Sequence, residues 1–180
     1  MSSTVIIAII GIIVVIIGGG FFLSQSSSPS LQDGGEGAEQ VKEQARQVPD
    51  LSFQDYSGNT VKLRDFTGTP LVVNSWAVWC PFCVKELADF AQVKKELDDQ
   101  FVFIAVDRAE SLELVKSFTD DLGVTDDLLF VLDPRDSFYR AIAGFSMPET
   151  IFVNRDGEIV FHKRGPMNAD EFREKIQLIL

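Results

Sequence analysis

The two cysteines of this chain constrain its fold more than any other feature, because only two residues separate them. They occur in the segment Trp79–Cys80–Pro81–Phe82–Cys83, and the 180-residue chain contains no other cysteine. A structural disulfide framework would distribute more cysteines along a small chain, and a bridge that closes so short a loop adds little stability. The pair therefore indicates chemistry at one defined point of the fold.

The residues around the pair predict that it lies where a strand meets a helix. Residues 71–77 are an apolar strand candidate, and apolar residues recur at helical spacing from Cys80 to Leu97. Positions three apart in a helix lie on one face, so Cys80 and Cys83 are close enough for a disulfide. The free N–H groups and the dipole at a helix N-terminus stabilise a thiolate. We therefore predict that Cys80 is the exposed nucleophile and that Cys83, one turn deeper, is the resolving thiol, with Pro81 in the first helical turn.

The rest of the globular region alternates between short apolar strands and amphipathic helices. Turn signals such as Ser57–Gly58–Asn59 and Arg155–Asp156–Gly157 separate these segments, and Asn168 is a good helix N-cap. The pattern predicts an α/β fold with a mixed central sheet and helices on both faces. The further expected strands are residues 51–53, 61–63, 101–106, 128–132, 150–154 and 159–162, and the further helices are residues 111–122, 137–143 and 168–180.

Two segments of different composition precede the globular domain. Residues 5–23 are an uncharged run of apolar residues and glycines, long enough to span a bilayer as one transmembrane helix. A cleaved signal peptide is the alternative, but it would carry a basic segment, and no Lys or Arg occurs before Lys42. The division we predict is an anchor at residues 1–23, a flexible linker rich in Ser, Gly and Glu at 24–47, and a folded domain at 48–180.

The formal net charge of −11 excludes one class of partner. A nucleic-acid-binding surface needs a basic patch, so we expect no nucleic-acid partner. The acidity is typical of a soluble, self-repelling surface. Neither flank of the anchor carries the Lys or Arg residues that set membrane orientation. Charge alone therefore does not determine which side of the membrane the domain occupies.

A structural zinc site is the main alternative for the cysteine pair. Zinc would need two further ligands, and the chain has no third cysteine and one histidine, His162. A carboxylate could complete such a set, but exchange chemistry explains the pair with fewer requirements. We expect no metal and no cofactor, and we interpret His162 as an ordinary strand position rather than a catalytic base.

A proline ahead of the predicted hairpin is the second informative feature. The segment Met147–Pro148–Glu149–Thr150 leads directly into the strand at residues 150–154. Trp76, Trp79 and the two cysteines, followed by this proline, resemble the thioredoxin superfamily. The arrangement is most similar to its membrane-anchored, extracytoplasmic branch, the thiol–disulfide oxidoreductases of the TlpA and ResA type. The resemblance covers about residues 48–180.

The resemblance implies a three-layer thioredoxin-like fold and assigns roles to individual residues. In that family the cysteine matching Cys80 is the nucleophile and the one matching Cys83 resolves the mixed disulfide. The proline matching Pro148 is cis, lies against the cysteines and helps to bind an extended substrate chain. The residue before it, Met147, would face the substrate. Three neighbours of the pair would support the active site: Trp79, Pro81 and Phe82.

The sequence departs from thioredoxin at several positions. Thioredoxin has a buried Asp six residues before the first cysteine, and here Asn74, which cannot titrate, stands at that position. Ala88 replaces a helix-kinking proline, so the long helix would be straighter. Glu86 and Asp89 could accept protons near Cys83, but a solvated helix face is our preferred interpretation of both. Asn74 and Glu86 are thus the candidate proton-transfer neighbours.

The predicted function is thiol–disulfide exchange with protein substrates outside the cytoplasm. We expect a membrane-anchored monomer that acts as a reductant, contributes to cell redox homeostasis, and is recharged by a membrane redox partner. Cytochrome c maturation is one target process that the resemblance suggests. The pair Pro81–Phe82 differs from the Gly-Pro of thioredoxin, which leaves the direction of electron flow open. The alternatives are a protein-thiol oxidant, a thiol peroxidase, and a redox-inert or metal-holding binding module on a tether.

Overall fold

The computed structural model describes residues 47–180. The predicted anchor and all but the last residue of the predicted linker lie outside the described residues. Within residues 47–180, no helix combines the length and the apolar character that crossing a membrane requires.

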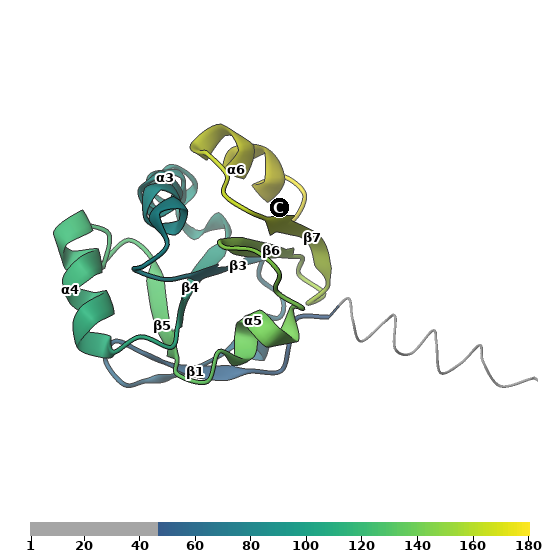
Figure 1. Ribbon diagram of the computed structural model, residues 1–180. Coiled ribbons are helices and arrows are strands. Elements are labelled where there is room, and N and C mark those ends of the chain that lie inside the picture. The colour runs from purple at the N-terminus through teal and green to yellow at the C-terminus, as the bar shows by residue number, and fades with distance from the viewer. Residues whose placement is uncertain (1–46) are drawn as a thin grey trace, which may run out of the picture. The chain divides into compact units, whose positions relative to one another are not determined.

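A single mixed sheet forms the centre of the described residues (Figure 1). The strand order across the sheet is β2-β1-β5-β4-β3-β6-β7, in which β3, β4 and β5 pair in parallel and the other pairs are antiparallel. The strands are β1 (Ser52–Asp55), β2 (Thr60–Lys62), β3 (Leu71–Trp76), β4 (Val102–Arg108), β5 (Leu129–Asp133), β6 (Glu149–Val153) and β7 (Ile159–Arg164).

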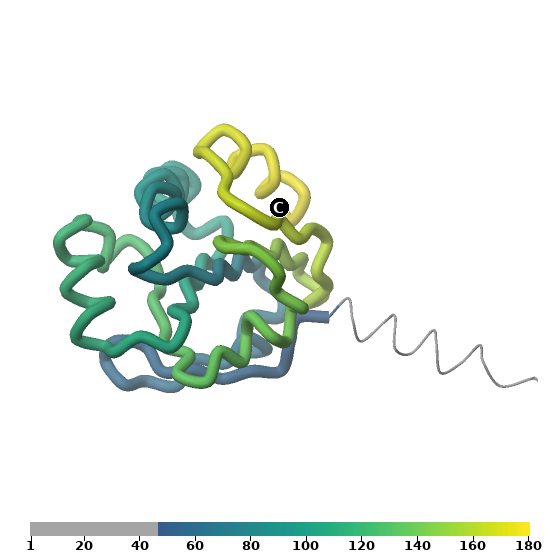
Figure 2. Tube along the Cα trace, in the orientation of Figure 1, coloured from purple at the N-terminus to yellow at the C-terminus, as the bar shows by residue number. Residues whose placement is uncertain are grey.

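Helices cover both faces of this sheet, as the sequence predicts. The α-helices are α3 (Pro81–Leu97), α4 (Leu112–Leu122), α5 (Ser137–Ala141) and α6 (Ala169–Ile176), and short 3₁₀ turns occur at Leu63–Phe66 and Asp98–Gln100. Side chains of α3, α4 and α6 share one apolar cluster, whereas α5 belongs to a second cluster on the other face. Figure 2 follows the chain from β3 through α3 to β4 and, later, from β7 into α6. The three-layer thioredoxin-like architecture is therefore confirmed.

The central strand β3 determines which side chains of the sheet lie under α3, the helix that begins at the cysteines. All six of its residues are buried, because β4 and β6 flank it and helices cover both of its faces. Successive side chains point to opposite faces, so Val72, Asn74 and Trp76 lie on the α3 side. Strand β6 pairs with β3 in a register that sets Asn74 opposite Thr150 and Ser75 opposite Glu149.

Several element boundaries differ from the predicted ones. Strand β4 extends to Arg108 because its last residues pair with Trp76 of β3 and Asp133 of β5. Helix α5 ends at Ala141 rather than 143, since the backbone reaches a left-handed conformation at Ala143 (φ 52°). Helix α6 begins after Asn168 as predicted, but it ends at Ile176 because tighter i→i+3 bonds close its last turn.

The hairpin of β6 and β7 contains an irregularity that affects the site. Phe152 pairs with Phe161, whereas Val153 pairs with Ile159, so β7 carries one extra residue at this point. A β-bulge of this kind shifts the pairing by one position along the strand. Beyond it, Ile151 faces His162 and Glu149 faces Arg164.

Candidate active site

The cysteine pair lies at the start of α3, where the sequence predicts it. Cys80 is the N-cap residue, Pro81 occupies the first turn, and the Cys83 N–H donates to Cys80 Sγ at 3.3 Å. The two residues form a disulfide with a Cα–Cα separation of 5.3 Å. In this oxidised state the two sulfur atoms are bonded to each other and are not thiolates, the form in which cysteine binds zinc.

The prediction that Cys80 is exposed is wrong for this oxidised state. Cys80 is only 3% exposed and Cys83 is fully buried. As the N-cap, the Cys80 side chain turns back over the first helical turn and joins the apolar cluster that includes Trp76. The exposed groups are instead two neighbouring aromatic side chains: Trp79 (61% exposed), which precedes Cys80, and Phe82 (59% exposed), which lies between the cysteines.

The segment before β6 approaches the cysteines from the other side. The Met147–Pro148 peptide bond is cis, as the resemblance implies. Met147 packs against the apolar cluster that contains both cysteines, and its sulfur lies 3.9 Å from the Ser75 hydroxyl of β3. Two residues earlier, Phe145 is 82% exposed. The structure thus packs Met147 against the cluster that contains the cysteines and buries Pro148 next to it in the chain.

A buried polar cluster lies beneath the start of α3. Glu86 Oε1 accepts a hydrogen bond from Asn74 Nδ2 at 2.9 Å, and Asn74 Nδ2 also donates to the Thr150 hydroxyl at 2.9 Å. The other oxygen, Glu86 Oε2, accepts from the Met167 backbone N–H at 3.2 Å. Glu86 is only 1% exposed, so the solvated-face interpretation of this residue is wrong.

Burial gives Glu86 an unusual proton affinity. Desolvation raises the pKa of this carboxyl to about 8, although its bonds to the Met167 N–H and Asn74 favour the ionised form. Glu86 also lines a cavity of about 300 Å³ together with Phe82, Lys85 and Asp89. It lies three residues after Cys83 on the same helix, hence on the same face. A carboxyl with a raised pKa is therefore placed on the same helix face as Cys83.

A second acidic pair supports the loop that leads into Cys80. Glu110 Oε2 accepts from the Val78 backbone N–H at 2.7 Å, and Asp107 Oδ2 accepts from the Glu110 N–H at 2.9 Å. Burial, and then the neighbouring Glu110, raises the pKa of Asp107 above its usual range. The sequence analysis missed this pair. A signal existed, because the ends of the parallel strands β3 and β4 meet at one edge of the sheet.

An aromatic and cationic stack connects the two halves of the site. The Arg108 guanidinium lies 6.0 Å from the Trp79 ring centroid and 3.5 Å from the Tyr139 ring centroid. Asp136 holds Arg108 in place through two bonds of 2.8 and 2.6 Å. The Tyr139 hydroxyl donates to the Ser146 carbonyl at 3.0 Å. A continuous series of contacts therefore runs from the residue beside Cys80 to the segment before Pro148.

His162 lies on β7, as predicted. Its Nε2 atom is 2.7 Å from Glu149 Oε2, and Glu149 is the residue that follows Pro148. Its partner in the site is thus this carboxylate, on the sheet face opposite the Glu86 cluster.

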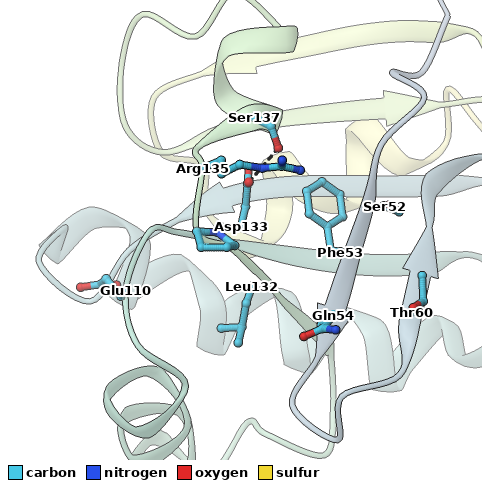
Figure 3. A pocket seen from close by; sticks show the side chains of 10 residues that line it. Ser52, Phe53, Gln54, Thr60, Glu110, Leu132, Asp133, Arg135 and Ser137 are labelled. Carbon is cyan, nitrogen blue, oxygen red and sulfur yellow. Dashed lines mark hydrogen bonds between the residues drawn. The ribbon is translucent and has the colours of Figure 1, made fainter.

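A separate cavity of about 370 Å³ lies between β1, β5 and the start of α5 (Figure 3). Its polar wall includes Asp133, which accepts from the Ser137 hydroxyl and from the Phe138 N–H, both at 2.7 Å. These bonds satisfy donors at the N-terminus of α5. Neither cysteine lines this cavity, so it is distinct from the disulfide site.

Comparison with known proteins agrees with this geometry. Residues 43–176 match the Redoxin family. The chain is 31% identical over 138 residues to the thiol:disulfide interchange protein DsbE of Allochromatium vinosum, covering 74% of this chain and 73% of that protein. It is 28% identical over 144 residues to the thiol–disulfide oxidoreductase ResA of Bacillus subtilis, covering 79% of each.

A solved structure shares the fold. The exposed lipoprotein thioredoxin Etrx1 of Streptococcus pneumoniae superposes with a TM-score of 0.65 at 24% identity, covering 73% of this chain and all of that one.

Proposed function

The chain belongs to the Redoxin family and is a thiol–disulfide oxidoreductase of the ResA and DsbE type, and from that premise we propose that it reduces protein disulfides outside the cytoplasm. The observation that carries the proposal is the Cys80–Cys83 disulfide at the N-terminus of α3, with the Met147–Pro148 segment packed against the same apolar cluster. The resemblance to the thioredoxin superfamily is thereby confirmed, and the catalytic roles below are our assignment.

The proposed reaction begins from the reduced pair. The Cys80 thiolate, stabilised by the N-terminus of α3, attacks one sulfur of a substrate disulfide, which breaks and releases the other sulfur as a thiol after it takes up a proton. Cys83 then gives its proton to Glu86 and attacks Cys80. This second step forms the Cys80–Cys83 disulfide and frees the remaining substrate thiol. Two electrons have passed from the enzyme to the substrate.

Around the cysteines, the proposal assigns supporting roles to the remaining site residues. Trp79 and Phe82 offer exposed aromatic surface beside the pair, and Pro81 occupies the first helical turn without an N–H to satisfy. Met147 and Pro148 receive an extended substrate chain. Asn74 holds the Glu86 carboxyl through one hydrogen bond.

The location and the biological process are the parts of the proposal that rest on similarity and composition. Residues 1–23 are proposed as a transmembrane anchor and 24–47 as a linker that carries the domain outside the cytoplasm. A membrane redox partner would supply the electrons that recharge the pair. The resemblance to the anchored branch of the thioredoxin superfamily supports a disulfide of apocytochrome c as one substrate.

The test is the reduction potential of the Cys80–Cys83 pair, measured by equilibration with glutathione. A value near roughly −270 mV, at the thioredoxin end of the scale, supports a reductant. A value near roughly −120 mV identifies an oxidant that donates its disulfide and refutes the proposed direction. Consumption of hydrogen peroxide at a rate above that of disulfide exchange would instead establish a thiol peroxidase. Failure to form a reversible disulfide would establish a redox-inert binding module.

A further inference from the structure

Glu149 is a buried carboxylate to which the proposed reaction gives no task. It is the first residue of β6, it follows Pro148 directly, and it is fully buried. Thr150, the next residue, faces α3 and bonds to Asn74. Because side chains alternate along a strand, Glu149 faces the opposite side of the sheet, away from the Glu86 cluster.

One oxygen of Glu149 binds two consecutive backbone amides. Glu149 Oε1 accepts from the N–H of Phe145 at 2.6 Å and from the N–H of Ser146 at 2.7 Å. Hydrogen bonds to a charged acceptor are shorter and stronger than those between neutral groups. A side chain at the start of β6 therefore fixes the backbone of the segment that precedes Met147 and Pro148.

The second oxygen is held from the neighbouring strand. Glu149 Oε2 lies 2.7 Å from His162 Nε2 and 3.8 Å from Arg164 Nε, and both of these residues belong to β7. The His162 side chain is 22% exposed, so this contact is largely shielded from water. Glu149 belongs to β6, its Oε2 atom contacts β7, and these two strands are paired in the sheet. The position of the carboxylate is therefore fixed by two neighbouring strands.

The segment that Glu149 holds, residues 145–147, ends at the cis Met147–Pro148 bond and contacts two other parts of the site. Met147 packs against the cluster that contains both cysteines, and the Ser146 carbonyl accepts from Tyr139. The Tyr139 ring stacks on Arg108, which also lies over Trp79. Phe145, at the start of the segment, is the most exposed large apolar side chain of the described residues.

We infer that Glu149 is a positioning residue that holds residues 145–147 in the shape that receives an extended polypeptide substrate, and that His162 fixes the orientation of its carboxylate. The inference rests on the proposed function, because it concerns how the substrate of that reaction is recognised. It predicts a separation between two kinds of substrate. A disulfide within a polypeptide depends on Glu149, whereas a small disulfide without a chain does not.

The experiment compares the turnover of variants of the full-length chain, purified in detergent, with two disulfide substrates. One is a synthetic peptide with a single intramolecular disulfide, and the other is hydroxyethyl disulfide. Excess dithiothreitol supplies the electrons that return the Cys80–Cys83 pair to the reduced state, and the rate without protein is subtracted. Glu149→Leu removes the acceptors at similar volume, and Glu149→Gln keeps one oxygen for the two amides. The matched control is Glu158→Gln, because the carboxylate of Glu158 also accepts a hydrogen bond, from Asn154 Nδ2 at 3.2 Å in the hairpin turn.

Glu149→Leu is expected to raise the KM for the peptide about tenfold, since two amides lose their acceptor, while kcat stays within about twofold. The rate with hydroxyethyl disulfide and the reduction potential should equal those of the wild type. Amide hydrogen exchange at Phe145 and Ser146 should become faster. The peptide KM of Glu149→Gln should be much closer to the wild-type value than that of Glu149→Leu. Glu158→Gln should match the wild type in every measurement.

Two results would overturn the inference. A folded Glu149→Leu variant with a wild-type KM for the peptide would exclude a role in recognition. Slower reaction with both substrates and a changed reduction potential would show that Glu149 acts on the cysteines. If this variant does not fold, His162→Leu carries the test, with an expected rise in peptide KM of about threefold. An unchanged KM in His162→Leu then contradicts the inference. A wild-type protein that reduces neither substrate refutes the proposed function itself.

Discussion

Glu86 and Glu149 are buried glutamates on opposite faces of the same sheet, and their surroundings differ. Glu86 accepts one bond from the Asn74 amide and one of 3.2 Å from a backbone N–H. Glu149 accepts two short bonds from backbone N–H groups and a third contact from His162, with Arg164 nearby.

The difference shows that two buried carboxyls can differ in proton affinity and in structural role, depending on how many hydrogen-bond donors surround them. Few donors compensate for the burial of Glu86, so its pKa rises to about 8 and the carboxyl can exchange a proton near neutral pH. Donors surround both oxygens of Glu149, an arrangement suited to holding a segment of backbone in place. In the proposed mechanism, the sheet face of Glu86 therefore serves proton transfer and the face of Glu149 serves substrate positioning.

Substitution of the cysteines should have the largest effect on activity, because the proposed roles of Glu86 and Glu149 both require the disulfide chemistry. Cys80→Ser is expected to abolish exchange, with a loss of more than about 10³-fold, because it removes the nucleophile. Cys83→Ser should also stop turnover but accumulate a mixed disulfide between Cys80 and the substrate. Non-reducing gel electrophoresis with a disulfide-containing protein distinguishes the two. Trapping by Cys80→Ser rather than Cys83→Ser would reverse the assigned roles.

Next in size is the effect of Glu86→Gln on the resolution step. Loss of the proton acceptor should slow release of the mixed disulfide about 10²-fold at pH 7. In the wild type this rate should rise with pH through about 8 as the Glu86 carboxyl ionises, and the variant should lack that component. Stopped-flow kinetics with a labelled peptide measures both. Asp89→Asn, on the same helix, is the control, and equal rates in Glu86→Gln and wild type would remove Glu86 from the mechanism.

The pH dependence of protein stability should reveal the raised pKa of Glu86 independently of catalysis. The pKa of Glu86 is raised from 4.5 to about 8 in the folded state, so the folded protein binds more protons than the unfolded chain between these values. The contribution of this carboxyl to the free energy of unfolding is therefore fully present below about pH 4.5 and is lost as pH rises to about 8. Between pH 5.5 and 7.0 the loss is about 2 kcal/mol. Urea unfolding should show a shallower decline in Glu86→Gln than in the wild type, because Asp107, whose pKa is also raised, keeps its own contribution. Parallel pH profiles of the two proteins would contradict the assignment.

The smallest effect concerns the Glu149 side of the comparison. A Cβ at Gly144 would meet the Tyr139 ring at 2.4 Å, so Gly144→Ala should displace the ring that stacks on Arg108 and bonds to Ser146. We expect a rise of about threefold in the peptide KM with an unchanged reduction potential. Tyr139→Phe should give a similar but smaller change, because it removes the hydroxyl and keeps the ring. A shifted potential in either variant would mean that the two faces are not independent.

Local patterns predicted much of the fold and the centre of the site. The cysteine pair, the helix that follows it and the α6 cap at Asn168 depend on neighbours in sequence, and each is found where expected. The burial of Glu86 could have been predicted as well. Cys83, Glu86, Leu87 and Phe90 are spaced i, i+3, i+4 and i+7, so Glu86 lies on the buried stripe of α3.

The contact between Glu149 and His162 could not be predicted in the same way. Its geometry depends on the bulge in the β6–β7 hairpin. In a regular hairpin from Val153 and Ile159, His162 would face Thr150 and lie on the α3 side of the sheet. The extra residue in β7 moves His162 to the face of Glu149. No local pattern in the sequence specifies that shift, because it depends on packing across strands.

The alternation of side chains along β6 also limits how this protein can change during evolution. Glu149 and Thr150 are adjacent in the chain, yet each bonds to a different half of the site. Insertion or deletion of one residue between Pro148 and Thr150 would break one of these connections or exchange their faces. Replacement of one side chain of β6 affects one of these connections, whereas a change in its length disrupts substrate positioning and proton transfer together. Length variation among relatives should therefore concentrate in the turn at 155–157 and be absent from this strand.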